Sequence, residues 1–472
     1  MNGVRSPRTP AFRSAEGSSC AAPPLRREEL TEEGIHAASG WRTRSWLLSV
    51  ALVFALPGTT LAQSTTGERQ RAGAWKARWG ETHDRALESG VTLNASYQGE
   101  AAGNLSGGDR KTARYTQQAE IETLLDMSRI AEVPGARVQV AINYRGGRSL
   151  SEDILHNQFP VQELYSSAQI VRLSQFNWLQ HFANQRVTVQ IGWSPVGNDF
   201  ARLPGFCKFQ NLVICGHANP MTVNSGSLNG PISQWGVRVK VWPTTQLYIK
   251  AGAYRNNIDG GTDSGFDLSL DHHGSFYPLE IGWERREAAP PGTIAVGVYH
   301  NTGRTPDVNS DINHDRAGLT GLPYLQRGGR HGGYVMGQQV VHRPESGNPW
   351  RALSIMGIAG AGDSHTARYS RFAIVGVLYE GPFARRQDDF ISFMVAWAET
   401  NPRLSGFQRD RDLVQSDAAS VQGWEAEMEF DYGIQVTPRL LVQPNLQYII
   451  QPGGNDERAN ALVLGLHFSV KL

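Results

Sequence analysis

The chain alternates apolar and polar residues over most of its length, and its last segment shows this most clearly. In ALVLGLHFSVKL, residues 461–472, apolar side chains occupy every even position from Leu462 to Leu472, while Gly465, His467, Ser469 and Lys471 lie between them. A period of two is typical of a β-strand with one apolar and one polar face. Chain ends are usually polar. The pattern therefore indicates that this strand presents its apolar face to an apolar environment.

About sixteen segments of roughly ten residues show the same alternation, which is the length of a tilted strand that crosses a bilayer. In GWEAEMEFDYG, the apolar positions from Trp424 to Tyr432 alternate with acidic ones. We expect strands at 91–104, 113–128, 136–146, 164–174, 186–193, 232–242, 245–256, 275–287, 292–303, 332–343, 350–361, 369–381, 387–399, 420–433, 439–450 and 460–472.

The connections between these segments are alternately short and long. WPTT and TPR are tight turns, whereas residues 194–231, 304–331 and 400–419 form long loops. Short turns on one rim and long loops on the other are typical of a bacterial outer-membrane barrel. The sequence thus favours a barrel whose two rims face different compartments.

Composition supports a barrel filled with water. Hydrophobic residues make up 40 % of the chain and the mean hydropathy is −0.37, as expected if only every second strand residue faces lipid. A soluble sandwich or propeller would also alternate, but aromatic residues near strand ends, such as Trp193, Trp235 and Trp424, resemble interfacial girdles. We predict an all-β protein: a closed antiparallel transmembrane β-barrel of about sixteen strands over 91–472, in which 461–472 pairs with 91–104.

The N-terminal part has a different character. Within WRTRSWLLSVALVFALPGTTLAQS, two arginines precede a short apolar run and small residues follow it, which predicts a signal peptide at 41–62 and cleavage after Ala62. Residues 1–40 read as an unstructured extension, either a long n-region or the result of a start codon placed upstream. Residues 63–90 are expected to form a periplasmic segment with a short helix. Export of this kind predicts localisation in the outer membrane.

Three cysteines are present, and two of them follow the predicted signal. Cys207 and Cys215 lie in one loop, and in an oxidising compartment this predicts a disulfide. A metal site with His217 is the alternative, although the spacing fits no zinc pattern. Lys plus Arg (45) nearly balance Asp plus Glu (44), so no basic field for nucleic acid is expected.

Enzyme signatures are missing from the sequence. G-x-S-x-G, H-E-x-x-H and the P-loop pattern do not occur, so we expect no catalytic residues, no cofactor and no metal site. DVNSDINHDR at 307–316 spaces Asp311, Asn313 and Asp315 like a calcium loop, but Arg316 occupies the position that requires Gly. We interpret it as a solvated outer loop.

Three stretches together carry a family resemblance: IGWSPVGNDFARLPGFCKFQNLVICG, SLNGPISQWGVRVKVWPTTQLYIKAGAY and LVQPNLQYIIQPGG. With the terminal strand, they resemble the carbohydrate-selective porins of the OprB family, from the helix at 73–88 to Leu472. The family often carries Arg where this chain has Trp193. The terminal strand also resembles the end signal read by the barrel-insertion machinery, with Leu472 in place of the usual aromatic residue. The resemblance implies a sixteen-stranded barrel that passes monosaccharides such as glucose by diffusion. A general or ion-selective porin remains the alternative.

A sugar pore needs charged groups that exchange hydrogen bonds with hydroxyls, and aromatic rings that stack on the sugar. The long loop at 194–231 is the candidate for a segment folded into the lumen. The candidate constriction residues are Arg202, Phe206, Lys208 and Phe209 in this loop and, on the strands, Arg137, Arg145, Arg238, Lys240, Glu425, Glu427 and Glu429. Expected partners are sugars, outer-membrane lipid and the barrel-assembly machinery; whether the barrel is a monomer or an oligomer stays open.

Overall fold

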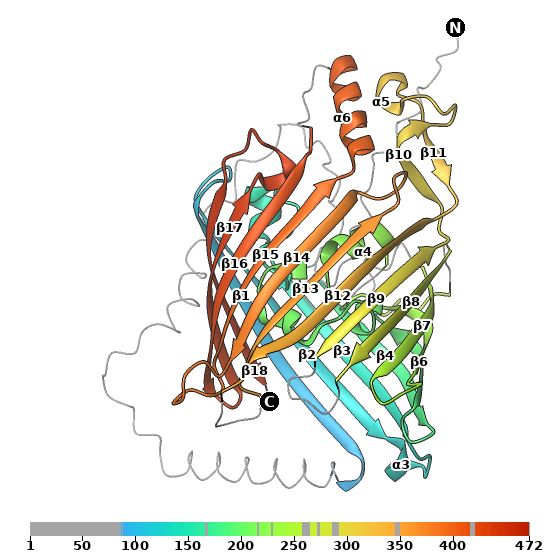
Figure 1. Ribbon diagram of the computed structural model, residues 1–472, viewed down its shortest axis with the longest axis vertical. Helices are drawn as coiled ribbons and strands as arrows, with labels where there is room; N and C mark the ends of the chain where they lie inside the picture. Colours follow the sequence, from blue (N-terminus) through green and yellow to red (C-terminus); the bar gives the residue numbers. More distant parts are fainter. Residues whose placement is uncertain are drawn as a thin grey trace, which may run out of the picture. The chain divides into compact units, whose positions relative to one another are not determined.

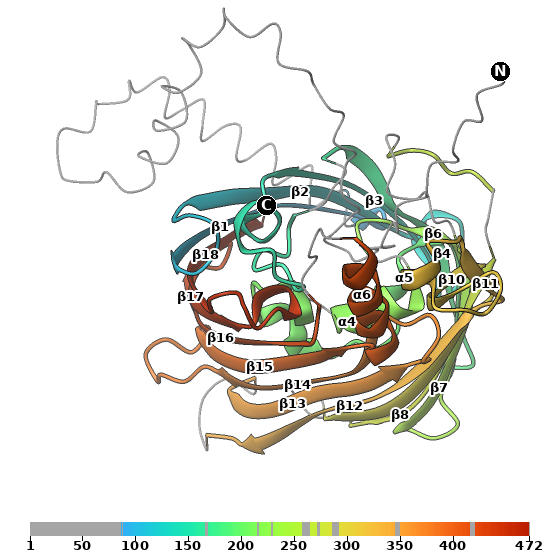
Figure 2. The same ribbon diagram turned by 90° about the horizontal axis from the view of Figure 1, so that it is seen from above.

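The barrel predicted from the alternation is present. The computed structural model describes residues 86, 88–165, 169–214, 217–227, 230–256, 265–270, 274–285, 292–344, 350–415 and 421–471. Within these residues, sixteen strands form a closed antiparallel barrel (Figures 1 and 2). The barrel strands are β1 (Val91–Ser106), β2 (Ala113–Asp126), β3 (Ala136–Gly147), β4 (Val171–Phe182), β5 (Val187–Ser194), β6 (Gln234–Val241), β7 (Leu247–Arg255), β8 (Ser275–Glu284), β9 (Thr293–Asn301), β12 (Arg330–His342), β13 (Ala352–Gly362), β14 (Tyr369–Glu380), β15 (Phe390–Thr400), β16 (Trp424–Thr437), β17 (Leu440–Ile450) and β18 (Ala461–Lys471).

The last strand closes the barrel by pairing with the first, as predicted. The β1–β18 register runs from Ser96 opposite Lys471 to Asn104 opposite Val463. On β18, Leu464 faces outward and is half exposed, whereas Val463 is buried. The predicted segments 1–40, 41–62 and 63–90 lie almost entirely outside the described residues and stay predictions, and Leu472 also lies outside them.

The outward face of the strands is apolar. Ile281 on β8, Val296 on β9 and Val335 on β12 lie side by side in the register and are 48 %, 56 % and 50 % exposed. Such a surface is stable only against lipid, because large contiguous apolar patches are rare on soluble monomers. No helix in the described part of the chain is long and apolar enough to cross a membrane.

The two rims differ as the loop lengths predicted. On the short-turn rim, β16 and β17 are joined through residues 438–439, and α3 (Met127–Ile130) joins β2 to β3. On the other rim, α5 (Ala317–Thr320), α6 (Pro402–Val414) and the separate two-stranded sheet of β10 (Thr305–Asp311) and β11 (Tyr324–Arg327) extend above the barrel (Figure 1).

The calcium-like stretch lies on this outer rim. One oxygen of the Asp311 carboxylate accepts from the backbone N–H groups of Asn313 and Asp315, both at 2.9 Å, and the other accepts from the Thr320 hydroxyl at 2.6 Å. The described residues contain no group of three or more His, Cys, Asp or Glu placed to hold a metal ion. The Asp311 carboxylate therefore orders its own loop.

One expected strand was wrong. The sequence placed a strand at 164–174, whereas β4 spans Val171–Phe182 and residues 148–165 enter the lumen, with a π-helix at Ser151–Leu155. In the β3–β4 pairing, Ala141 is opposite Gln175 and Ile142 is opposite Leu173, so Ser174 is bulged. A bulge shifts the alternation by one residue and turns Ser174 and Gln175 to the same side. Because the bulge interrupts the period-two alternation of apolar and polar residues, the bounds of this strand could not be recognised from the sequence.

Two loops fold into the barrel and fill much of it. We call 148–165 the first inner segment and the described part of 195–233 the second inner segment. The second contains the 3-10 helices Val196–Asn198, Pro204–Lys208 and Leu212–Ile214 and the helix α4 (Asn219–Ser225), which lies within the ring of strands (Figure 2). The main hydrophobic cluster is inside the lumen, where loop residues such as Phe200 and Phe206 pack with wall residues such as Tyr254 and Phe390.

Candidate functional site

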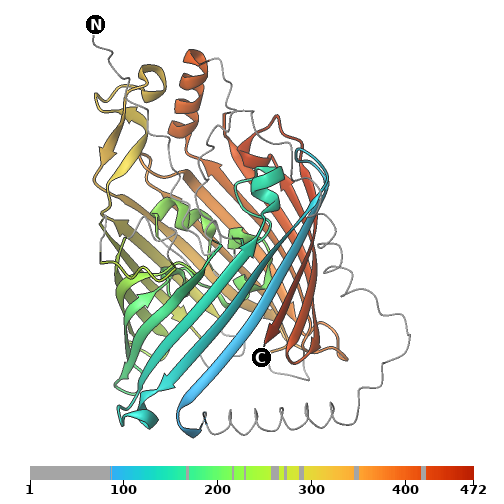
Figure 3. The same ribbon diagram turned by 180° about the vertical axis from the view of Figure 1, so that it is seen from behind.

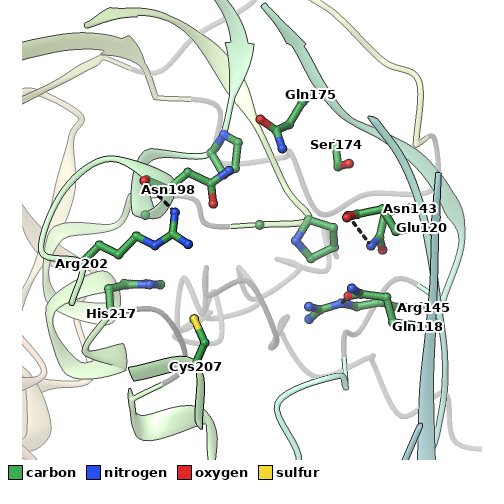
Figure 4. A pocket seen from close by; sticks show the side chains of 14 residues that line it. Gln118, Glu120, Asn143, Arg145, Ser174, Gln175, Asn198, Arg202, Cys207 and His217 are labelled. Carbon is green, nitrogen blue, oxygen red and sulfur yellow. Dashed lines mark hydrogen bonds between the residues drawn. The ribbon is translucent and has the colours of Figure 1, made fainter. Parts of the chain in front are cut away.

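A polar cavity of about 210 Å³ remains between the second inner segment and the wall made by β2, β3 and β4 (Figure 4). These three strands lie next to one another in the sheet (Figure 3). Because the inner segments occupy so much of the lumen, this cavity is a candidate for the narrow part of a passage. Its lining residues are Gln118, Glu120, Asn143, Arg145, Ser174, Gln175, Pro195, Gly197, Asn198, Arg202, Cys207, His217, Gly230 and Pro231.

On the wall side, Arg145 is the main cationic group. Its Nε donates to Gln118 Oε1 at 2.6 Å, and one terminal nitrogen donates to the carbonyl oxygen of Glu163 at 3.1 Å. Glu120 is half-buried and accepts a hydrogen bond from the Asn143 side-chain amide at 3.1 Å. The wall thus presents a fixed guanidinium and a carboxylate, and both are placed by neighbouring amides.

On the loop side, Arg202 is exposed to the cavity and donates to the carbonyl oxygen of Asn198 at 3.3 Å. His217 is buried beside it, and its Nε2 is 2.7 Å from the Thr222 hydroxyl. Burial and then the neighbouring Arg202 guanidinium lower the pKa of His217 to about 4. The imidazole is therefore neutral at neutral pH, and Arg202 carries the positive charge on this side.

Of the other loop candidates, Phe206 and Phe209 are not at the surface of the cavity. They are 0 % and 3 % exposed and belong to the hydrophobic cluster between loop and wall. Lys208 is half-buried; its Nζ lies 3.9 Å from Glu380 and 4.4 Å from the centre of the Phe390 ring. Lys208 thus ties the loop to β14 and β15, and the two phenylalanines pack in the hydrophobic cluster between loop and wall.

The cationic strand candidates lie at separate places. Arg238 pairs with Asp199 at 3.1 Å, so it binds the second inner segment. Lys240 lies 3.6 Å from Glu284 and 4.3 Å from the ring centres of Trp242 and Tyr248, toward the short-turn rim.

Arg137 is exposed at the end of β3, close to α3, and is not part of the cavity. Of the seven strand candidates, only Arg145 lines it.

The three glutamates of β16 point inward but are covered. Glu425, Glu427 and Glu429 are at most 1 % exposed, and their carboxylates accept hydrogen bonds from the inner segments. They hold the loops in place rather than line the cavity.

Cys207 lines the cavity, and its predicted partner Cys215 lies outside the described residues, so the disulfide stays a prediction. Trp193, which replaces the Arg frequent in the resembling family, packs edge-on against Trp235 with ring centres 5.8 Å apart. It does not line the cavity.

Sequence reasoning missed most of the cavity lining other than Arg145 and Arg202. Gln118 and Glu120 lie on the inward face of β2 in TQQAEIETLL, and the alternation alone could have indicated their direction. No local signal distinguishes Asn198 or His217 from other polar loop residues. Ser174 and Gln175 depend on the bulge, which has no signature in this sequence.

Comparison with known proteins gives concordant results. Residues 110–472 match the carbohydrate-selective porin, OprB family. Porin B of Pseudomonas aeruginosa is 34 % identical over 410 residues, which cover 82 % of this chain and 89 % of that protein. The putative porin QuiX of Acinetobacter baylyi is 27 % identical over 82 % of this chain and 90 % of its own length. A structure of Pseudomonas putida OprB at high pH superimposes with a TM-score of 0.79 and 33 % identity, covering 84 % of this chain and 97 % of that one.

Proposed function

This chain belongs to the OprB family of carbohydrate-selective porins, and on that premise we propose that monosaccharides such as glucose cross its barrel through the cavity between the second inner segment and β2–β4. The protein is an outer-membrane channel and not an enzyme. Passage is passive: the sugar enters on the long-loop rim, loses part of its water in the cavity and leaves on the short-turn rim.

The observation that carries this proposal is the pairing of donors and acceptors across the cavity. Arg202 on the loop faces Arg145 on the wall, and Glu120 and the side-chain amides of Gln118 and Asn143 lie beside Arg145 (Figure 4). A sugar hydroxyl both donates and accepts, so guanidinium groups and a carboxylate can replace the hydrogen bonds to water that it loses. Several modest contacts permit entry without trapping the sugar, which a conducting site requires.

Two further partners follow from the same architecture. The apolar outward face is proposed to contact outer-membrane lipid. The alternating terminal strand β18 is proposed to be the segment that the barrel-assembly machinery recognises during insertion.

Sugar block of single-channel current tests the proposal. We expect glucose to reduce the current through the wild-type channel in planar bilayers, and Arg202→Ala to weaken this block about tenfold, since a hydrogen bond to a charged group contributes about 1.5–3 kcal/mol. Arg137→Ala is the matched control: it removes the same charge from an exposed position outside the cavity and should leave the sugar block unchanged.

A wild-type channel that glucose does not block at any accessible concentration would contradict the proposal. Liposome swelling with sugars and with amino acids of equal size then decides the alternative. Equal rates for both would indicate a general diffusion porin.

A further inference from the structure

We propose that the acidic inward face of β16 positions the constriction: Glu425, Glu427 and Glu429 hold both inner segments and, through them, the cavity-lining Arg145. We call these three side chains the carboxylate row. They lie on alternate residues of one strand, which is separated from β2 by β17, β18 and β1 in the barrel order. In this proposal the row affects selectivity without touching the permeating sugar. Only the part of the proposal that concerns sugar rests on the proposed function.

Glu425 holds the first inner segment by its backbone. One carboxylate oxygen accepts from the N–H groups of Gln158 at 2.8 Å and Phe159 at 3.2 Å, and the other accepts from the N–H of Gly453 in the loop between β17 and β18. A side chain that accepts several backbone N–H groups is a strong anchor, because all of these hydrogen bonds must break before the segment can move. Glu425 thus fixes the depth of this segment in the lumen.

Glu429 holds the second inner segment in the same manner. Its two oxygens accept from the N–H groups of Gln210 at 2.8 Å and Asn211 at 3.0 Å. Glu427, between the other two, accepts from the side-chain amides of Asn157 and Asn211. One side chain therefore binds both inner segments at once, and the row fixes them relative to each other.

The two segments also bond directly to each other and then to the cavity. The N–H of Glu163 donates to the carbonyl of Gln210 at 3.0 Å, and the N–H of Leu212 donates to the carbonyl of Pro160 at 2.9 Å. The carbonyl of Glu163 in turn accepts from Arg145 at 3.1 Å. A continuous chain of hydrogen bonds thus leads from Glu429 through Gln210 and Glu163 to the guanidinium that lines the cavity.

The row has no other evident role among the contacts of the described residues. None of the three glutamates forms an ion pair within the described part of the chain, and all three are buried. Burying carboxylates without cations is costly unless their oxygens are satisfied. Here the satisfying groups come from the loops, so removing one carboxylate oxygen leaves backbone donors of the inner segments without an acceptor.

Glu429→Gln is the decisive variant, measured as full-length protein in planar bilayers. The amide keeps one acceptor oxygen but turns an N–H₂ group toward a backbone donor. We expect the open-channel current in KCl to rise and to fluctuate more, and the sugar block to weaken about tenfold, as for the loss of one buried hydrogen bond. Glu122→Gln is the matched control, because Glu122 also faces inward but accepts only from the wall side chains of Asn94 and Gln139.

The link to Arg145 has its own readout. If Glu429 acts through Arg145, the double variant Glu429→Gln/Arg145→Gln should be blocked by sugar no more weakly than Arg145→Gln alone. Additive effects would overturn the link, and a wild-type current in Glu429→Gln would overturn the whole proposal.

A folding defect in Glu429→Gln does not prevent the test. Asn211→Ala leaves the wall intact and removes the amide that binds Glu427, so it should change the KCl current in the same direction, and an unchanged current would contradict the proposal. The KCl measurement needs no sugar. Suppose that the KCl current changes in the variants but sugar does not block the wild-type channel. The role of the row would then be supported, and the proposed sugar function would be contradicted.

Discussion

The lipid-facing surface gives the sharpest prediction about stability. Val296 is the middle of three outward residues on β9, Ile294, Val296 and Val298, each at least half exposed. Its neighbours in the register are Ile281 on β8 and Val335 on β12, both apolar and about half exposed. An arginine introduced by Val296→Arg would have no polar partner on either adjacent strand.

The expected cost follows from the depth of the site. A charged residue on the lipid face costs about 2–4 kcal/mol near the bilayer midplane and about 0–1 kcal/mol near the interface. His300 lies on the same face of β9, four residues closer to the long-loop rim. With a rise of about 3.3 Å per residue and a tilt of about 40°, it lies roughly 10 Å nearer that rim. His300→Arg is therefore the matched control.

The free energy of folding can be measured by urea titration of each variant in phospholipid vesicles, with the mobility shift of unheated samples on gels as a second readout. We expect Val296→Arg to be less stable than His300→Arg by about 2 kcal/mol, roughly a factor of thirty in the folding equilibrium. Equal destabilisation by the two variants would refute the assigned depth. A cost below about 1 kcal/mol for Val296→Arg would refute the assignment of this face to lipid.

Two further predictions concern the second inner segment. Cys207 and Cys215 are expected to form a disulfide, so thiol labelling of the non-reduced mature protein should detect no free cysteine, and labelling of both would contradict it. His217 has a pKa lowered to about 4, whereas an unfolded histidine titrates near 6.5. The unfolded state therefore binds the proton first as the pH falls, and the native state should lose roughly 3 kcal/mol between about pH 6.5 and 4. His217→Gln should remove this loss from the urea midpoints; an unchanged acid dependence would show that other groups cause it.

The strand assignments show which kind of information the local sequence contains. Alternation over two faces is a property of each segment by itself, because lipid outside and water inside impose it on every strand. The closed barrel, the pairing of β1 with β18 and the contrast between the rims therefore followed from the sequence. The exception is β4, where the bulge at Ser174 exchanges the two faces within one strand.

The candidate site depended on the tertiary structure. The alternation correctly predicted that Arg145 and Glu429 point inward, but it could not indicate which of the inward residues the loops cover. Glu429 is buried because Gln210 and Asn211, more than two hundred residues away in the sequence, bring their N–H groups to it. Arg145 lines the cavity because the loops leave that wall open.

The sequence by itself determined the barrel and the direction of its side chains, since both result from short-range periodicity and the two solvents. Only the tertiary structure decided which part of the lumen stays open. The path of the inner segments is selected by long-range hydrogen bonds from wall carboxylates such as Glu425 and by packing of loop aromatics such as Phe206. Phe206 is an example: its residue type predicted a sugar contact, and its burial against the wall makes it part of the anchor. Contacts of this kind join residues far apart in the chain, so no local pattern contains them.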